Sequence, residues 1–179
     1  MRYVVNWPAR MEEMASFVGL DEDAKGLIRA SAPMIDEHAK ALTDAVYDHF
    51  MGYPQARKFF LTETGEVDEE RLARRKHTLI RWLRETAASD LDERFAGYLL
   101  AMGVSHGYPP AHREHLGPVP SRHIIGTISF VQSAIGDLLL REMDDTELAL
   151  RTSMAWNRIL MVELVLLLAG YITEPDGTP

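Results

Sequence analysis

The chain of 179 residues contains no cysteine, and this absence excludes several kinds of site at once. Without a thiol it forms no disulfide, offers no thiolate ligand to a metal, and holds neither an iron–sulfur cluster nor a cysteine-based zinc site. A cofactor also has no thiol to which it could be attached covalently. Any metal or cofactor must therefore be held by other side chains, of which histidine is the most suitable nitrogen ligand.

Long apolar segments are also scarce. The N-terminal sequence, residues 1–8, has neither a long apolar core nor a small-residue cleavage site, so it is not typical of a signal peptide. The most apolar run, residues 159–171, is about one third too short for a membrane span and carries Glu163. We therefore expect a cytoplasmic protein that does not use a membrane as a partner.

Positive charge is in the minority: 19 Lys and Arg stand against 27 Asp and Glu, and the net charge is −8. Basic residues cluster only at residues 57–58 and 74–76 and are elsewhere interleaved with acidic ones. This pattern argues against nucleic acid as a partner. Hydrophobic residues make up 46% of the chain, which is enough to form the core of one folded domain.

Helical periodicity runs through almost the whole sequence, and no segment has the alternation of a strand. The predicted fold class is all-α, with two long helices at the end. The expected helices cover 21 to about 30, 33 to about 51, 54 to about 61 (short), 68 to about 86, 89 or 90 to 106, 121 to about 142, and 145 to about 172. We expect a single domain over 1–179, with 1–20 as an N-terminal extension and 173–179 as a flexible tail.

One predicted helix carries an apolar stripe that ends in a histidine. Phe95, Leu99, Met102 and His106 recur at steps of three and four, so their side chains share one side of the helix. An axial haem ligand needs such an imidazole beside an apolar wall, and neutral imidazole suits iron. A solvated or capping histidine at a helix end would have the same spacing. The stripe alone leaves both interpretations open.

Four motifs in order resemble the protoglobins and the globin domains of globin-coupled sensors. The similarity spans roughly residues 17–172 and rests on Ala45-Val-Tyr-Asp-His-Phe50, Leu72-Ala-Arg-Arg-Lys-His-Thr-Leu-Ile-Arg-Trp-Leu83, Met102-Gly-Val-Ser-His106 followed by Val119-Pro-Ser-Arg-His-Ile124, and Ala155-Trp156. This resemblance implies a globin-like helical sandwich around a haem. Because the chain has no cysteine, the haem would be haem b, bound non-covalently.

The resemblance also implies roles for individual residues. His106 would be the proximal iron ligand, with its second ring nitrogen bonded to a backbone carbonyl of the same helix. Tyr47 would lie on the distal side and donate a hydrogen bond to a bound gas. Leu79 would line the distal roof. Val46 and Leu79 stand where archaeal protoglobins tend to have tryptophan and phenylalanine, so we expect a roomier pocket.

Further cofactor contacts follow from the same resemblance. Phe60 would pack on the haem edge, Met102 would belong to the proximal stripe, and Phe130 and Ala134 would flank the macrocycle. An equally good interpretation is that four of these residues belong to the hydrophobic core without contacting a cofactor, namely Phe60, Leu79, Phe130 and Ala134. Trp82 and Trp156 are interpreted as aromatic residues that pack helices together.

The other histidines have an alternative interpretation that we weigh less. The side chains of His112, Glu114, His115 and His123 could form a zinc cluster, but this segment lacks the HExxH pattern and reads better as a loop with solvated histidines. His38, His49 and His77 are interpreted as residues of helix surfaces or as satisfied core residues, with His77 pointing away from the pocket.

The leading functional hypothesis is a haem-binding globin that reversibly binds O2, CO or NO, for gas binding or sensing. Two alternatives remain. One is a haem enzyme (an NO dioxygenase, a nitrite reductase or a peroxidase-like protein), although no distal acid–base pair is visible. The other is a haem-free globin-like interaction module. We also expect a homodimer formed through the last two long helices, whose apolar faces exceed what one core needs.

Overall fold

The computed structural model describes residues 6–88, 90–109, 115–169 and 171, and the elements in these ranges are helices. The one extended feature described is an isolated bridge between Leu61 and Val67. The prediction of an all-α fold is thus confirmed. The helices are α1 (Trp7–Phe17), α2 (Glu22–Gly52), α3 (Pro54–Arg57), the 3₁₀-helix η1 (Lys58–Phe60), α4 (Glu69–Ala88), α5 (Glu93–Gly107), α6 (Ser121–Glu142) and α7 (Thr146–Leu168).

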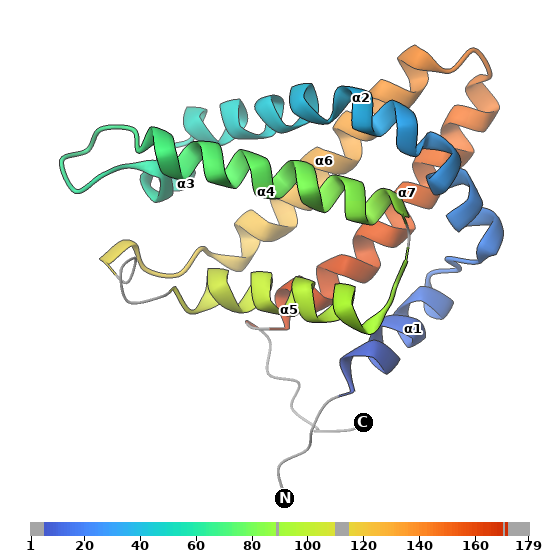
Figure 1. Cartoon of the computed structure of the whole chain (residues 1–179), viewed down its shortest axis with the longest axis horizontal. Helices are drawn as coiled ribbons and strands as arrows, with labels where there is room; N and C mark the ends of the chain where they lie inside the picture. The colour runs from blue at the N-terminus through green and yellow to red at the C-terminus, as the bar shows by residue number, and fades with distance from the viewer. Residues whose placement is uncertain (1–5, 89, 110–114, 170, 172–179) are drawn as a thin grey trace, which may run out of the picture.

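The helices form two crossed layers (Figure 1). Helices α2 and α4 lie side by side along one edge, whereas α6 and α7 pack on each other and run diagonally behind them. Helix α5 lies across α7 on the opposite side from α4. As a result, the C-terminal ends of α2 and α5 and the N-terminal ends of α4 and α6 meet at one end of the molecule.

Aspartate side chains begin four of the long helices, because a carboxylate there accepts an otherwise unpaired backbone N–H. Asp21, Asp68 and Asp145 each accept the backbone N–H of the residue three positions later, at 2.9, 2.9 and 3.0 Å. The sequence predicts helix starts at these three positions. The prediction for α5 was wrong by two or three residues. Asp92, rather than Ser89 or Asp90, accepts the Phe95 N–H at 2.7 Å and starts that helix.

The predicted helix break before Pro33 is absent: α2 continues through this proline. An interior proline costs about 3 kcal/mol because it removes one hydrogen bond and crowds the preceding turn. Ile28 and Ile35 lie on the buried face on either side of Pro33, and both are 0% exposed. Full burial of each contributes about 1.5–3 kcal/mol, which offsets the cost of the proline. Tertiary packing therefore joins two segments that the sequence predicts to be separate helices.

The two ends of the chain also differ from expectation. The segment expected as an N-terminal extension contains α1, whose Met11 is 0% exposed and which packs on α5 and α7. Asn6 caps this helix by accepting the Ala9 N–H at 3.2 Å. Helix α7 ends at Leu168, a turn before the expected end at 172, a residue that lies outside the described ranges.

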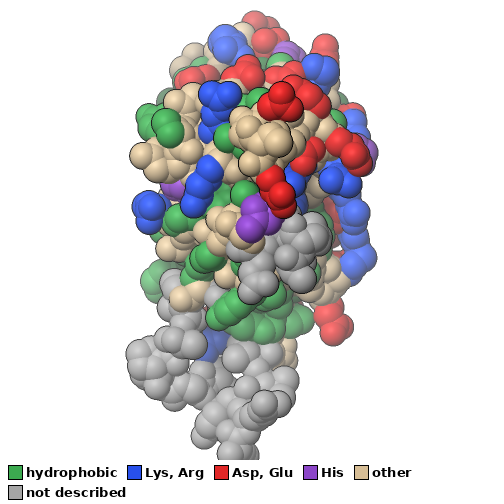
Figure 2. All heavy atoms as spheres, turned by 90° about the vertical axis from the view of Figure 1, so that its left-hand side faces the viewer, with side chains coloured by type: hydrophobic (Ala, Val, Ile, Leu, Met, Phe, Trp, Pro, Cys, Tyr) green, Lys and Arg blue, Asp and Glu red, His purple; other side chains and the backbone are tan. Residues whose placement is uncertain are grey.

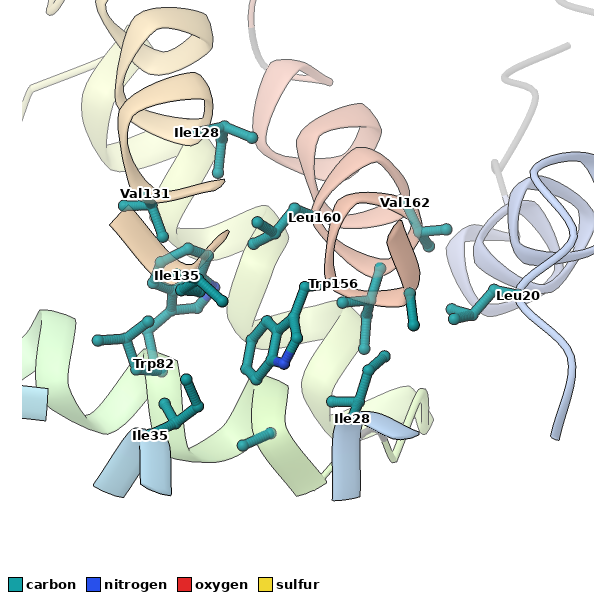
Figure 3. Packing of buried hydrophobic residues seen from close by; sticks show 14 of the residues in the cluster. Leu20, Ile28, Ile35, Trp82, Ile128, Val131, Ile135, Trp156, Leu160 and Val162 are labelled. Atoms are coloured by element: carbon teal, nitrogen blue, oxygen red, sulfur yellow. The ribbon is translucent and has the colours of Figure 1, made fainter. Parts of the chain in front are cut away.

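The hydrophobic core fills the space between α2, α4, α6 and α7 (Figure 3). Trp156 is 0% exposed, and its indole N–H donates to the Ser31 hydroxyl at 2.9 Å. Trp82 lies beside Ile35 and Ile135 in the same core. The prediction that both tryptophans pack helices together agrees with these positions. Because this core occupies the middle of the molecule, it leaves the end beside α3 open for a site.

Candidate functional site

A cavity of about 540 Å³ opens between α2, α4, α5 and α6 at the end of the molecule where these helices meet. Figure 2 looks onto this end, where hydrophobic side chains gather in the lower half beneath a more charged upper half. The volume lies in the range of pockets that hold small molecules and cofactors. Its walls are mainly aliphatic and aromatic.

Helix α5 presents His106 to the cavity from its last turn. The imidazole Nδ1 lies 2.6 Å from the carbonyl oxygen of Met102, one turn earlier. A carbonyl only accepts, so Nδ1 carries the proton and Nε2 is the nitrogen with the lone pair. This hydrogen bond within the helix is the one expected for an imidazole that ligates a metal. Met102 and Ser105 line the cavity beside it.

Gly103, three residues before His106, is required by the packing of α5 on α7. It is buried, and a Cβ built on it would lie 2.3 Å from the carbonyl oxygen of Leu167 on α7. Only glycine lets the two helix backbones approach so closely. The close approach fixes the depth of α5 against α7, and with it the position of His106.

Helix α2 supplies the aromatic wall. Tyr47 is 7% exposed and lines the cavity. Its ring meets those of Phe50 and Phe60 edge-on, with centroids 5.5 Å apart in each pair. Burial raises the pKa of the Tyr47 phenol, and the nearby Arg75 partly opposes the shift. The phenol is therefore a neutral hydrogen-bond donor. Phe60 also lines the cavity, from η1.

Helix α4 contributes one face to the cavity. Leu79 lies on it together with its neighbour Thr78 and with Arg75 and Trp82, one turn away on either side. Sequence reasoning identified Leu79 but not these three as site residues, although helical spacing from Leu79 would have found Arg75 and Trp82. Trp82, interpreted only as a packing residue, thus has two roles.

Helix α6 faces the cavity with its first two turns, through Arg122, His123, Ile124, Thr127 and Ile128. Phe130 and Ala134, the α6 residues expected to flank the cofactor, lie further along and are not among the residues that line the cavity. Phe130 instead stacks on His49, with ring centroids 4.6 Å apart. Five of the seven expected site residues are therefore brought together: His106, Tyr47, Phe60, Leu79 and Met102.

The charged groups on the cavity lining are all basic, in a chain whose net charge is −8. Arg75 and Arg122 belong to it, and no carboxylate does among the residues that the structure describes. His123 is half-buried in the first turn of α6, so its interpretation as a solvated loop histidine was wrong. Burial and the nearby cations Arg122 and Lys58 lower its pKa. Such a lining suits an apolar ligand with negative groups at one edge.

The zinc alternative finds no support. His112 and Glu114 lie outside the described ranges, and His115 is exposed. Within those ranges no group of three or more His, Asp or Glu side chains could hold a metal ion. His38 and His77 do not line the cavity, and His77 is exposed, as expected. His49 lines the cavity from α2, and its interpretation as a surface or core residue missed this position.

Comparisons with known proteins agree with this geometry. The family model described as Protoglobin matches residues 8–176. The globin domain of a globin-coupled sensor from Geobacter sulfurreducens superimposes with a TM-score of 0.73 at 19% identity, covering 90% of this chain and 97% of that one. The globin domain of DosC from E. coli gives 0.67 at 18% identity, covering 89% and 97%.

A curated relative is the heme-based aerotactic transducer HemAT of Halobacterium salinarum, which is 26% identical over 91 residues. The matched stretch covers 51% of this chain and only 18% of the transducer. The two structural matches show the fold, and the match to the family model over most of the chain shows the family.

Proposed function

This chain belongs to the protoglobin family, and from that premise we propose that it binds diatomic gases at the iron of a haem held by His106. Membership of a globin family implies haem binding. The observation that carries the proposal to this site is the His106 imidazole, whose Nδ1 is tied to the Met102 carbonyl at 2.6 Å while the ring lines the cavity. This arrangement orients the lone pair of Nε2 for a metal.

The residues of the cavity fit a haem. Its aromatic and aliphatic walls suit the flat apolar face of a porphyrin, and Arg75 and Arg122 supply cations for the two carboxylates of the macrocycle. We propose haem b, because the sequence has no cysteine for covalent attachment. The haem supplies the iron chemistry, and the protein supplies an imidazole ligand, a dry pocket and polar groups.

Tyr47 is the residue that we propose for the distal hydrogen bond. Its phenol is neutral, buried and on the cavity lining. An O–H donor favours a ligand that gains negative charge on binding, such as O2, over one that stays nearly neutral, such as CO. Leu79, one turn from Trp82, would form the apolar part of the same wall.

We propose a sensing or gas-binding role rather than a particular pathway. Two of the similar proteins are described as a globin-coupled sensor and as a heme-based aerotactic transducer, which supports this direction.

An absorption spectrum of the purified protein tests the proposal. A Soret band that shifts on reduction with dithionite and again on addition of CO is expected, and acid–butanone should extract all of the haem. Colour that stays with the polypeptide would contradict non-covalent haem b. A protein that takes up no haem on reconstitution with hemin would overturn the function.

A homodimer through α6 and α7 is a second proposal. These helices expose a series of large apolar side chains between 37% and 59% exposed, namely Ile125 and Leu140 on α6 and Leu150, Met154 and Val165 on α7. By length and composition alone, helix α6 is apolar enough to cross a membrane, with a mean hydropathy of 1.4 over its most apolar 18 residues. Only 28% of this apolar stretch is buried within the chain. We propose that a second copy of the chain covers this surface.

A further inference from the structure

Glu163 is a carboxyl group in the middle of the core. It lies on α7 and is 0% exposed. Its Oε2 accepts the indole N–H of Trp82 at 2.6 Å, and its Oε1 has no hydrogen-bond partner within the described residues. An ionised carboxylate with one unpaired oxygen would be very costly in such a place.

The surroundings of Glu163 keep it neutral. Burial raises its pKa to about 8, and the Thr86 hydroxyl and the Trp82 indole N–H, which both lower the pKa, only partly oppose this shift. The charged groups in this part of helix α4 are paired with groups other than Glu163: Arg81 with Glu85 at 3.0 Å, Glu85 also with Arg94 of α5 at 3.1 Å, and Arg84 with Asp36 of α2. On α5 the titratable group that interacts with Glu163 is Tyr98. Its buried hydroxyl also lacks a partner within the described residues, and the Arg81 guanidinium lies over its ring. None of the described ion pairs involves Glu163.

Glu163 is hydrogen-bonded to a residue of the cavity wall, Trp82. Trp82 lines the cavity, whereas Glu163 does not. One helical turn after Glu163, Leu167 meets Gly103 and lines the cavity as well. Glu163 and Leu167, one turn apart on the same side of α7, therefore contact α4 and α5, respectively.

We propose that Glu163 is a positioning residue for the ligand pocket: its carboxyl group holds the Trp82 indole in the cavity wall from outside the cavity. A buried indole N–H needs an acceptor, and this hydrogen bond fixes which edge of the ring turns to the cavity. The inference rests on the proposed function for the identity of what the cavity binds. The orientation of the indole can be tested without it.

Three variants separate positioning from general stability. Glu163→Gln keeps a neutral acceptor of the same shape, whereas Glu163→Leu removes the acceptor. Thr152→Val is the matched control, because Thr152 is another buried polar residue of α7, and its hydroxyl donates to Leu148 at 2.8 Å, away from Trp82. A labelled indole ¹⁵N–H spectrum follows the three tryptophans directly. Loss of one signal in Trp82→Phe assigns the signal of Trp82.

In haem-free protein, the Trp82 indole signal should move upfield and exchange faster with solvent in Glu163→Leu, and stay near its place in Glu163→Gln and Thr152→Val. Between pH 6 and 9.5 the chemical shift of the Trp82 indole N–H should change with pH in the parent and stay constant in Glu163→Gln. An unmoved signal in a folded Glu163→Leu overturns the proposal. If that variant does not fold, identical pH profiles of the parent and Glu163→Gln overturn it.

In the haem-loaded protein, Glu163→Leu should change the CO association rate about fivefold, the factor that a hydrogen bond of about 1 kcal/mol represents. Glu163→Gln and Thr152→Val should stay near the parent. Equal rates in all four proteins, or an equal change in all three variants, would overturn the role in the pocket. If the chain takes up no haem, only the proposed function is contradicted, because the indole experiment does not need haem.

Discussion

The α-carbon of Gly103 lies so close to Leu167 that a Cβ there would come within 2.3 Å of the Leu167 carbonyl oxygen. This contact joins α5 to α7 one turn before His106. Leu167 lines the cavity and His106 lies one turn after Gly103, so the separation of the two helices sets where the imidazole stands. Packing against α7 thereby explains the glycine three residues before His106.

Gly103→Ala should destabilise the fold and impair haem retention. The new methyl group meets backbone atoms that cannot rotate away, and such overpacking typically costs about 1–3 kcal/mol. Urea unfolding of the parent and the variant measures the change. Gly97→Ala is the matched control on the same helix, because nothing lies within 4 Å of its Cβ position. That control should be neutral or slightly stabilising. Equal losses in both variants would mean that the close approach does not matter.

His106→Ala should abolish most haem retention, because it removes the proposed axial ligand. The matched control is His38→Ala. His38 makes the same local hydrogen bond, from Nδ1 to the Met34 carbonyl at 3.0 Å, but does not line the cavity. Hemin titration followed by Soret absorbance compares the two. If the His38 variant loses as much haem as the His106 variant, the ligand assignment is wrong.

Tyr47→Phe should speed O2 dissociation and leave CO dissociation much less affected. A hydrogen bond to a charged acceptor contributes about 1.5–3 kcal/mol, which corresponds to a change of about 10–150-fold in rate. Stopped-flow measurements of both gases decide this. Tyr108→Phe, at a phenol that is 69% exposed and off this cavity, should change neither rate. Unchanged O2 release from the Tyr47 variant would place the stabilising group elsewhere.

Stability should fall as the pH rises from about 5 to 8, and Glu163 should account for part of this fall. The pKa of the carboxyl group is about 8 in the folded chain against 4.5 for an ordinary glutamate. Between these values the unfolded state releases the proton while the folded state keeps it, so the folded state binds more protons and rising pH favours unfolding. Urea midpoints of Glu163→Gln should vary less over this range. Parallel curves for both proteins would contradict a protonated Glu163.

Met154→Glu together with Leu150→Glu should shift the protein to a monomer, because two carboxylates would be buried in the proposed α6–α7 interface. Both side chains are more than half exposed, so the monomer fold should survive. Sedimentation velocity at several concentrations measures the change. The control His77→Glu, on an exposed position of α4, should leave the mass unchanged. A parent protein that is already monomeric would refute the dimer.

The order and type of most elements, apart from α1 and the unbroken α2, could be predicted from the sequence because they depend on local chemistry. Apolar spacing and aspartates at helix starts set most of the helices, and the starts at Asp21, Asp68 and Asp145 were predicted correctly. Motif order likewise gave the family. The side of α5 that carries His106, and its bond to the Met102 carbonyl, follow from i to i+4 geometry within one helix.

Only the tertiary structure decided the features that depend on contacts between distant segments. It carried α2 through Pro33, because Ile28 and Ile35 are buried together. It brought Glu163 to Trp82, 81 residues apart, and Leu167 to Gly103. It also directed the first turns of α6 to the cavity. Local sequence encodes which face of a helix is apolar, but the depth and angle at which two such faces meet depend on the whole packed core.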